Sequence, residues 1–389
     1  MSITAPKGFV ASGFAAGIKP SGALDLALVA TEDGAPVPTA ATFTANRAAA
    51  APVLVSRDHL AVTGGRSAAV VVSSGNANAA TGVEGRADAE RMCQLVADGL
   101  GVEAHDVLVC STGLIGFRLP MGTIETGIPA LLRSRDGSLE AASLAATGML
   151  TTDTGTKEVL VESSAFAVAG MAKGAAMLAP NMATMLAILT TDAAVEPATL
   201  AQILRIAVHD SFNSMTVDGC TSTNDTVVLM ASGRAGPVDS STVADAVGDA
   251  CAELSRQMAA DAEGGSKVVE IRVTGARSDD EALRAARQVA ESPLVKCSLN
   301  GEDPYWGRVI SELGSAGVDF EMDRVDIAYG GVSVCRDGVG VDHDTAAVAR
   351  HLAGSAVDLH CHLGLADGTG TVTGVDLGHG YIDENRTTS

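Results

Sequence analysis

The chain has 389 residues, of which 47% are hydrophobic and only 3% aromatic, and its formal net charge is −21. This length predicts two or three domains, and the acidic balance argues against nucleic-acid partners and anionic lipid surfaces. The composition is that of a globular protein, which excludes the disordered and fibrous classes.

The first half of the chain alternates strand-like and helix-like segments. Residues 24–30, 67–74 and 107–113 are apolar runs typical of strands, and residues 85–101 carry apolar side chains at helical spacing. This alternation, with polar or glycine-rich joins, predicts an α/β or α+β body.

The second half begins with two helical patterns, over residues 196–212 and 241–264. Pro197 near the first start and Gly264 at the second end are typical helix boundaries. No internal repeat or low-complexity linker separates the two halves.

The C-terminal third is expected to be rich in strands. Residues 267–275 alternate as a strand, and residues 280–292 form an amphipathic helical pattern. Two further strands are predicted over 357–365 and 371–377, joined by a hairpin turn at 366–370.

The seven cysteines are widely spaced and form no CxxC pair, which argues against a disulfide framework or a zinc ribbon. His360 and His362 share one strand face, but no acidic or cysteine partner at suitable spacing supports a metal site. The N-terminus lacks the pattern of a signal peptide, and no long uninterrupted apolar stretch occurs. We therefore expect a reduced, cytoplasmic protein with no membrane span and no metal.

Thr184 is the candidate nucleophile, within the mostly apolar stretch KGAAMLAPNMATMLAILTTDA at 173–193. The alternative is an ordinary threonine in a buried strand. A threonine hydroxyl needs a base within reach, and an N-terminal threonine supplies its own α-amine. Cleavage before Thr184, by attack of its hydroxyl on the carbonyl of Ala183 and hydrolysis of the resulting ester, would create that amine.

Two neighbouring features favour this chemistry. Lys173 could place a positive charge near a carboxylate or a developing oxyanion. Thr112 and Gly113, in CSTGLIG after a predicted strand, could supply a hydroxyl and a backbone N–H to an oxyanion hole.

These segments resemble the ornithine acetyltransferase family, the glutamate N-acetyltransferases. KGAAMLAPNMATML is similar to the family's autoprocessing pattern KGxGMxxPxxATML. The other family motifs occur along essentially the whole chain as PKGFVASGFAAGIKPSG, SSGNANAATG, CSTGLIG, LTTDTGTKE, DGCTSTNDT, DAEGGSK, DPYWGR and YIDEN.

The resemblance implies roles for particular residues. The chain would be cut between Ala183 and Thr184, Thr184 would carry the acetyl group, and Thr112 and Gly113 would form the oxyanion hole. The implied substrate-binding residues are Thr151, Lys173, Thr184, Glu263, Asn385 and Ser389.

The resemblance also implies an α+β fold with stacked αββα layers of the DmpA-like type. The two chains produced by self-cleavage would together form this fold. Residues 1–183 would carry the oxyanion hole and substrate loops. Residues 184–389 would carry the nucleophile, a smaller α/β subdomain and a β-rich C-terminus. These chains are expected to associate further, as a heterotetramer or larger assembly.

The implied reaction moves acetyl from N2-acetyl-L-ornithine to L-glutamate by ping-pong kinetics, through an acetyl-threonine, in arginine biosynthesis. No metal or organic cofactor is implied, although acetyl-CoA would be a second donor in a bifunctional enzyme. Two alternatives are an autoprocessed paralogue, acting as an acyltransferase, amidohydrolase or aminopeptidase on another amino acid, and a degenerate paralogue that serves only binding or assembly.

Several departures from the family pattern leave the substrate open. Tyr305 stands where the family usually has asparagine, and Ala175 replaces a common glycine. Ser73 and Ala80 replace a common asparagine and cysteine. Ser389 lies four residues after Asn385, where the family's Ser or Thr lies five residues on.

Overall fold

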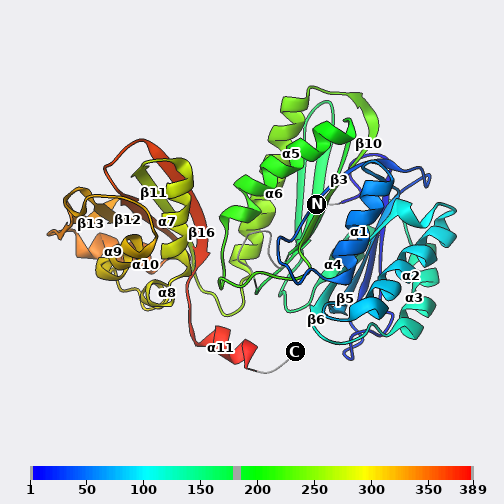
Figure 1. The fold of residues 1–389 in the computed structure, drawn as a ribbon, viewed down its shortest axis with the longest axis horizontal. Coiled ribbons are helices and arrows are strands. Elements are labelled where there is room, and N and C mark those ends of the chain that lie inside the picture. Colours follow the sequence, from blue (N-terminus) through cyan, green and yellow to red (C-terminus); the bar gives the residue numbers. More distant parts are fainter. Residues whose placement is uncertain (1–2, 178–184, 387–389) are drawn as a thin grey trace. The chain divides into compact units, whose positions relative to one another are not determined.

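The computed structural model describes residues 3–177 and 185–386 (Figure 1). The chain packs into two compact units, and each is described by itself. Unit 1 comprises Met1–Asn213 and Cys220–Met258, and unit 2 comprises Ser214–Gly219 and Ala259–Ser389. Within the described ranges, no helix combines the length and the apolar character that a membrane crossing requires.

The first sheet of unit 1 has four strands in the order β1-β2-β5-β6. They are β1 (Phe9–Phe14), β2 (Leu26–Thr31), β5 (Ala69–Asn76) and β6 (Val107–Leu114). β5 and β6 run parallel, with Ser74 opposite Thr112 and Gly75 opposite Gly113. Parallel neighbours finish at the same edge of a sheet, so the carboxyl ends of these two strands lie side by side.

The second sheet of unit 1 has six strands in the order β4-β3-β10-β9-β8-β7. They are β3 (Val37–Phe43), β4 (Arg66–Ser67), β7 (Lys157–Glu162), β8 (Ala167–Lys173), β9 (Leu186–Ala194) and β10 (Thr226–Pro237). β8 and β9 flank the segment of the predicted cleavage site and are antiparallel, with Lys173 opposite Leu186. β9 and β10 run parallel, with Leu186 opposite Thr226.

Helices cover both outer faces of these sheets. The helices of unit 1 are α1 (Ala51–Val62), α2 (Gly82–Leu100), α3 (Met121–Arg133), α4 (Leu139–Met149), α5 (Pro197–Asp210) and α6 (Ser240–Ala260), with short 3₁₀ turns at Ala104–Asp106 and Phe212–Ser214. α1, α2 and α3 share a hydrophobic core with one face of the four-stranded sheet. The opposite face, α4 and the six-stranded sheet share a second core.

α5 and α6 lie over the outer face of the six-stranded sheet, where α5 contacts β3 and α6 places Leu254 against Gly170 of β8 (Figure 1). Strands enclosed on both faces read as nearly continuous apolar runs, which explains the strand signals of β2, β5 and β6. The layers confirm the predicted α+β fold with an αββα arrangement.

Unit 2 is built on one mixed sheet in the order β14-β13-β12-β15-β11-β16. Its strands are β11 (Val268–Ala276), β12 (Asp326–Tyr329), β13 (Val332–Arg336), β14 (Val339–Gly340), β15 (Ala356–His362) and β16 (Gly368–Val375). Its helices are α7 (Asp279–Glu291), α8 (Pro293–Asn300), α9 (Trp306–Ser315), α10 (Thr345–Leu352) and α11 (His379–Asn385), with a 3₁₀ turn at Met322–Arg324. One face of the sheet and its helices form a single hydrophobic core.

The predicted hairpin at 366–370 is wrong. β15 and β16 belong to one sheet, but β11 lies between them, parallel to β15 and antiparallel to β16. A tight turn joins only adjacent antiparallel strands, so the segment after β15 crosses β11 instead. β16 begins at Gly368, inside the predicted turn. The other predicted strands and helices are confirmed, with small shifts at their ends.

Candidate active site

The predicted nucleophile Thr184 and its neighbour Ala183 lie outside the described residues, as does Ser389. The described chain resumes at Met185, which is bonded to Thr184, and β9 begins one residue later at Leu186. The contacts of Met185 are therefore the nearest described surroundings on that side of the predicted cleavage site.

Thr112 and Gly113, the predicted oxyanion-hole residues, occupy the carboxyl end of β6. Thr112 is buried, whereas Gly113 is exposed and has a φ of +128°. A Cβ built on Gly113 would lie 2.3 Å from the carbonyl carbon of Gly75 on β5. Glycine at 113 therefore permits a close approach of β5 and β6 at this edge of the sheet.

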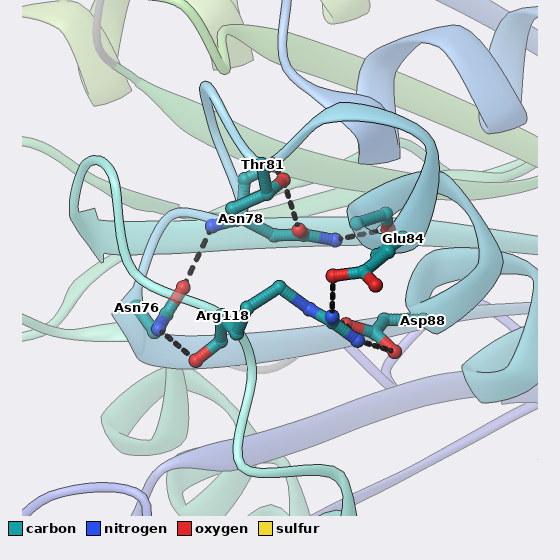
Figure 2. A network of polar contacts seen from close by, with 7 residues as sticks. Asn76, Asn78, Thr81, Glu84, Asp88 and Arg118 are labelled. Carbon is teal, nitrogen blue, oxygen red and sulfur yellow. Dashed lines mark hydrogen bonds and ion pairs between the residues drawn. The ribbon is translucent and has the colours of Figure 1, made fainter.

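The loops that follow β5 and β6 are tied together by a polar network (Figure 2). The Asn76 amide donates to the carbonyl oxygen of Arg118 at 3.0 Å, and its Oδ1 accepts from the N–H of Asn78 at 2.8 Å. The Arg118 guanidinium forms two hydrogen bonds with Asp88, at 2.8 and 3.0 Å, and also contacts Glu84. The network braces the two loops that leave the Thr112–Gly113 edge.

Asn224 also contacts this edge, although its sequence pattern gave no reason to select it. Its buried side-chain amide donates to the carbonyl oxygen of Ser111 at 2.9 Å and to that of Ala77 at 2.6 Å. Ser111 is bonded to Thr112. The one available signal was the position of Asn224 in the family motif DGCTSTNDT.

Lys173 lies at the end of β8 in a buried cluster of charges around Asp153. The Asp153 carboxylate is 3.8 Å from Lys173 Nζ and 2.6 Å from Lys157 Nζ, and it accepts from the N–H of Gly174 at 2.6 Å. Burial raises the pKa of Asp153, but the two lysines and the Gly174 N–H outweigh it and bring the pKa to about 2. Asp153 is therefore ionised at neutral pH and compensates both lysines.

Thr151 is held by the same carboxylate, because its N–H donates to Asp153 at 3.2 Å. Lys19, from the GIKPSG motif, donates to the carbonyl oxygen of Leu150 at 2.7 Å, so it fixes the residue before Thr151. Burial lowers the pKa of Lys19, and the charge of Lys173 acts in the same direction. The structure thus brings two predicted substrate contacts, Thr151 and Lys173, together around Asp153.

Asp225 is the second buried carboxyl group of this region. Its Oδ1 accepts from the N–H of Met185 at 2.8 Å. Burial raises the pKa of Asp225 well above its usual range, although the Met185 N–H, Ser222 and the Lys173 charge act in the opposite direction. Burial therefore favours the protonated form of this carboxyl group, which lies beside the residue that follows the predicted nucleophile.

The predicted substrate contacts of unit 2 also meet each other. The Asn385 amide, in α11, donates to Glu263 Oε2 at 2.7 Å. Gly264 has a φ of +62°, and a Cβ built on it would lie 2.0 Å from the backbone nitrogen of Tyr381. A glycine after Glu263 is what lets α11 approach closely enough for this bond.

The predicted site residues therefore form three groups. Thr112 and Gly113 lie at the end of β6, Thr151 and Lys173 surround Asp153, and Glu263 bonds to Asn385. The first two groups belong to unit 1 and the third to unit 2.

Two departures from the family pattern have clear surroundings. The Ser73 hydroxyl lies 2.9 Å from that of Ser111, so this departure adjoins the residue before Thr112. Tyr305, in unit 2, is 56% exposed, and the Arg308 guanidinium lies 6.0 Å from its ring centroid. A side chain at 305 is thus free to meet solvent or a ligand.

His360 and His362 both contact the Thr274 hydroxyl, at 2.9 Å each. No cluster of three or more His, Cys, Asp or Glu side chains suited to a metal ion occurs in the part of the chain that the structure describes. The shared contact explains why both imidazoles point toward the Thr274 hydroxyl.

The αββα layers and the glycine-lined end of β6 fit the predicted class of acyl-transfer enzymes. The chain belongs to the ArgJ family, whose model matches residues 10–387. It is 46% identical over 390 residues to the arginine biosynthesis bifunctional protein ArgJ of Mycobacterium leprae, covering 98% of this chain and 94% of that protein. The protein of the same name from Thermobifida fusca is 45% identical over 388 residues, 99% of each chain.

Among solved structures, the chain is similar to ornithine acetyltransferase complexed with ornithine from Mycobacterium tuberculosis. The identity is 45%, the match covers 46% of this chain and 94% of that chain, and the TM-score is 0.44. The relatives confirm the predicted family and the predicted enzyme class, an acetyltransferase of arginine biosynthesis.

Proposed function

We propose that the chain cuts itself before Thr184 and then transfers acetyl from N2-acetyl-L-ornithine to L-glutamate. Membership of the ArgJ family over nearly the whole chain is the observation that carries this proposal. Two features support it: the close approach of β5 and β6 at the proposed oxyanion hole, and the buried Asp153 cluster that holds part of the proposed substrate site.

Self-cleavage would proceed by an N→O acyl shift. The Thr184 hydroxyl attacks the Ala183 carbonyl carbon, a C–O bond forms, the C–N bond breaks, and the hydroxyl proton moves to the Thr184 nitrogen. Water then hydrolyses the ester, which leaves a carboxylate on Ala183 and a free α-amine on Thr184. That amine is the base that the hydroxyl needs for the next reaction.

Transfer would follow in two steps. The Thr184 hydroxyl attacks the acetyl carbonyl of the donor, and ornithine leaves with the proton on its nitrogen. The amine of glutamate then attacks the acetyl-threonine ester, which yields N-acetylglutamate and restores the hydroxyl. Thr112 and Gly113 would donate hydrogen bonds to the oxyanion that develops in both steps.

The remaining residues would bind the amino-acid substrate. Thr151, Lys173, Glu263, Asn385 and Ser389 would contact it, in the roles that the family resemblance implies. The residues given these roles need no metal or organic cofactor, and acetyl-CoA would serve as an alternative acetyl donor. We also propose a cytoplasmic enzyme in which two cleaved chains form a heterotetramer or larger assembly.

The first prediction tests the cleavage and the transfer together. Wild-type protein on a denaturing gel should give two fragments, with masses matching residues 1–183 and 184–389. Thr184→Ala should remain one chain, because it lacks the attacking hydroxyl. Acetyl-labelled N2-acetyl-L-ornithine with glutamate should give labelled N-acetylglutamate with wild type only.

Two results would contradict the proposal. Cleavage of Thr184→Ala at the same bond would rule out the N→O shift. Labelled free acetate without N-acetylglutamate would instead favour an amidohydrolase, in which water replaces glutamate as the acceptor.

A further inference from the structure

Asn224 and Asp225 are adjacent residues whose side chains bond to two different segments of unit 1. Asn224 Nδ2 donates to the carbonyl oxygen of Ser111 at 2.9 Å, and Asp225 Oδ1 accepts from the N–H of Met185 at 2.8 Å. Ser111 is bonded to Thr112 of the proposed oxyanion hole, and Met185 is bonded to the proposed nucleophile.

Because a peptide group is planar, each of these two contacts constrains the whole peptide group that it binds. The six atoms of a peptide group lie in one plane. The plane that contains the Ser111 carbonyl also contains the N–H and Cα of Thr112. Asp225 holds the Met185 N–H, and Met185 is the residue after the proposed nucleophile. Each hydrogen bond therefore holds a backbone group of a residue that adjoins a proposed reactive residue.

The segment that carries Asn224 and Asp225 is itself firmly held. Thr44 donates to it twice, from its hydroxyl to the Ser222 carbonyl oxygen at 2.8 Å and from its N–H to the Asp225 carbonyl oxygen at 3.0 Å. Ser222 Oγ accepts from the Asn224 N–H at 3.0 Å. Both side chains are buried, at 6% and 1% exposure, so the segment can act as a rigid brace.

We propose that Asn224 and Asp225 are positioning residues: Asn224 holds Ser111, next to Thr112 of the oxyanion hole, and Asp225 holds Met185, next to the proposed nucleophile. This inference rests on the proposed function, because it assigns the pair to that reaction. The pair would serve self-cleavage and acetyl transfer alike, since both use the same nucleophile and the same oxyanion donors. A misplacement of about 1 Å in such an arrangement can cost about 100-fold in rate.

The contact between Asp225 and Met185 makes the proposal testable with a conservative variant. A carboxyl group and a carboxamide both offer an oxygen acceptor to an N–H donor. Asp225 Oδ2 has no hydrogen-bond partner among the described residues, so an amide nitrogen there loses no described contact. Asp225→Asn thus keeps the acceptor for the Met185 N–H, whereas Asp225→Ala removes it.

The second prediction compares these variants during cell-free synthesis, where pulse–chase labelling follows self-cleavage from the intact chain. Asp225→Ala should slow cleavage by about 100-fold and lower kcat of the cleaved fraction similarly, with KM for N2-acetyl-L-ornithine little changed. Asp225→Asn should restore both rates to near the wild-type values. Asn224→Ala should slow both rates as Asp225→Ala does.

Asp192 supplies a matched control. It is a buried carboxyl group on β9 that accepts from the backbone N–H groups of Ala167 at 2.8 Å and Lys7 at 3.3 Å. It lies six residues beyond Leu186, about 20 Å along the strand at roughly 3.3 Å per residue. Asp192→Ala should lower the melting temperature without slowing cleavage or transfer.

Three outcomes would overturn the inference. Folded Asp225→Ala or Asn224→Ala could react at the wild-type rate. Asp192→Ala could slow the reaction as much as Asp225→Ala, which would indicate general loss of stability. Asp225→Asn could be as slow as Asp225→Ala, which would assign the effect to the carboxyl group itself rather than to the contact with Met185. Wild type that neither cleaves nor transfers would contradict the proposed function instead, so the two failures are separable.

Discussion

The buried charges around Asp153 in unit 1 compensate one another. A buried ammonium or carboxylate is costly unless opposite charge and hydrogen bonds offset the loss of water. Asp153 offsets both Lys157 and Lys173 and accepts backbone N–H groups as well. Asp153 therefore holds Lys173, the proposed substrate-binding lysine. The ionisation of Asp153 should also contribute to the free energy of unfolding.

The third prediction concerns the stability that the ionised Asp153 contributes and its loss at low pH. Its pKa is about 2 in the folded protein, against about 3.9 for an unfolded aspartate. A lowered pKa contributes stability that is complete above about pH 4 and is lost as the pH falls towards 2. The contribution is about 2–3 kcal/mol, by the linkage between pKa and folding.

Urea unfolding of wild type and Asp153→Asn at several pH values would measure this contribution. Other carboxylates titrate in both proteins, so the difference between the two isolates Asp153. The advantage of wild type should shrink by about 2–3 kcal/mol between pH 5 and pH 2. An advantage that does not change with pH would show that Asp153 is not ionised in the folded protein.

Among the elements, α11 depends on one glycine. Gly264 adopts a left-handed conformation, and a side chain on it would collide with the backbone of α11 at Tyr381. The helix carries Asn385, which bonds to Glu263, the residue before that glycine. The close approach of α11 and the proposed substrate contact of Asn385 therefore both require a glycine at position 264.

The fourth prediction uses Gly264→Ala to displace α11. The added methyl group should separate Asn385 from Glu263 and raise KM for N2-acetyl-L-ornithine about tenfold, as expected for the loss of one charged hydrogen bond. The change in kcat should be smaller, because Thr184 and the oxyanion hole are not on this helix. Steady-state kinetics of the purified variant provide the measurement.

Gly265→Ala is the matched control for this variant. A Cβ on Gly265 would meet the Ala262 carbonyl oxygen at 3.3 Å, and its φ is not in the left-handed region. This variant should keep the wild-type KM. Equal effects of the two substitutions, or no effect of Gly264→Ala, would show that α11 does not control substrate binding.

For the whole molecule, the six-stranded sheet of unit 1 joins the two halves that cleavage would create. β3, β4, β7 and β8 precede Thr184, whereas β9 and β10 follow it. β9 pairs with β8, and β10 pairs with β3, so strands of the two halves are neighbours at two places in one sheet. The Asn224 bonds to Ser111 and Ala77 add contacts across the same division.

The fifth prediction follows from this sheet. The two fragments should remain associated after cleavage, because separating them would expose sheet edges and the core between the sheets. Under native conditions both should elute together from a sizing column, at a mass no smaller than the 39.1 kDa of the intact chain. They should separate only in denaturant. Elution of two independent fragments without denaturant would contradict this arrangement.

Much of the site could be anticipated from the sequence, but the residues that hold it could not. Thr112, Gly113, Thr151 and Lys173 stand in three recognisable motifs, which coincide with the ends of β6 and β8 and with the loop before β7. Asn224 stands in a motif as well, yet its partner Ser111 is 113 positions away. No spacing within a motif can reveal such a partner, because only the order of strands in the sheets brings the two together.

The sequence by itself determined the local elements, the family and the proposed Ala183–Thr184 junction, because periodicity and short motifs depend on neighbouring residues. Tertiary structure alone decided that β11 lies between β15 and β16, that Asp153 is the partner of Lys173, and that Asn224 and Asp225 reach two different segments. These features depend on strand order and register, because the strands of the sheets set where the loops that carry Asp153, Asn224 and Asp225 meet their partners.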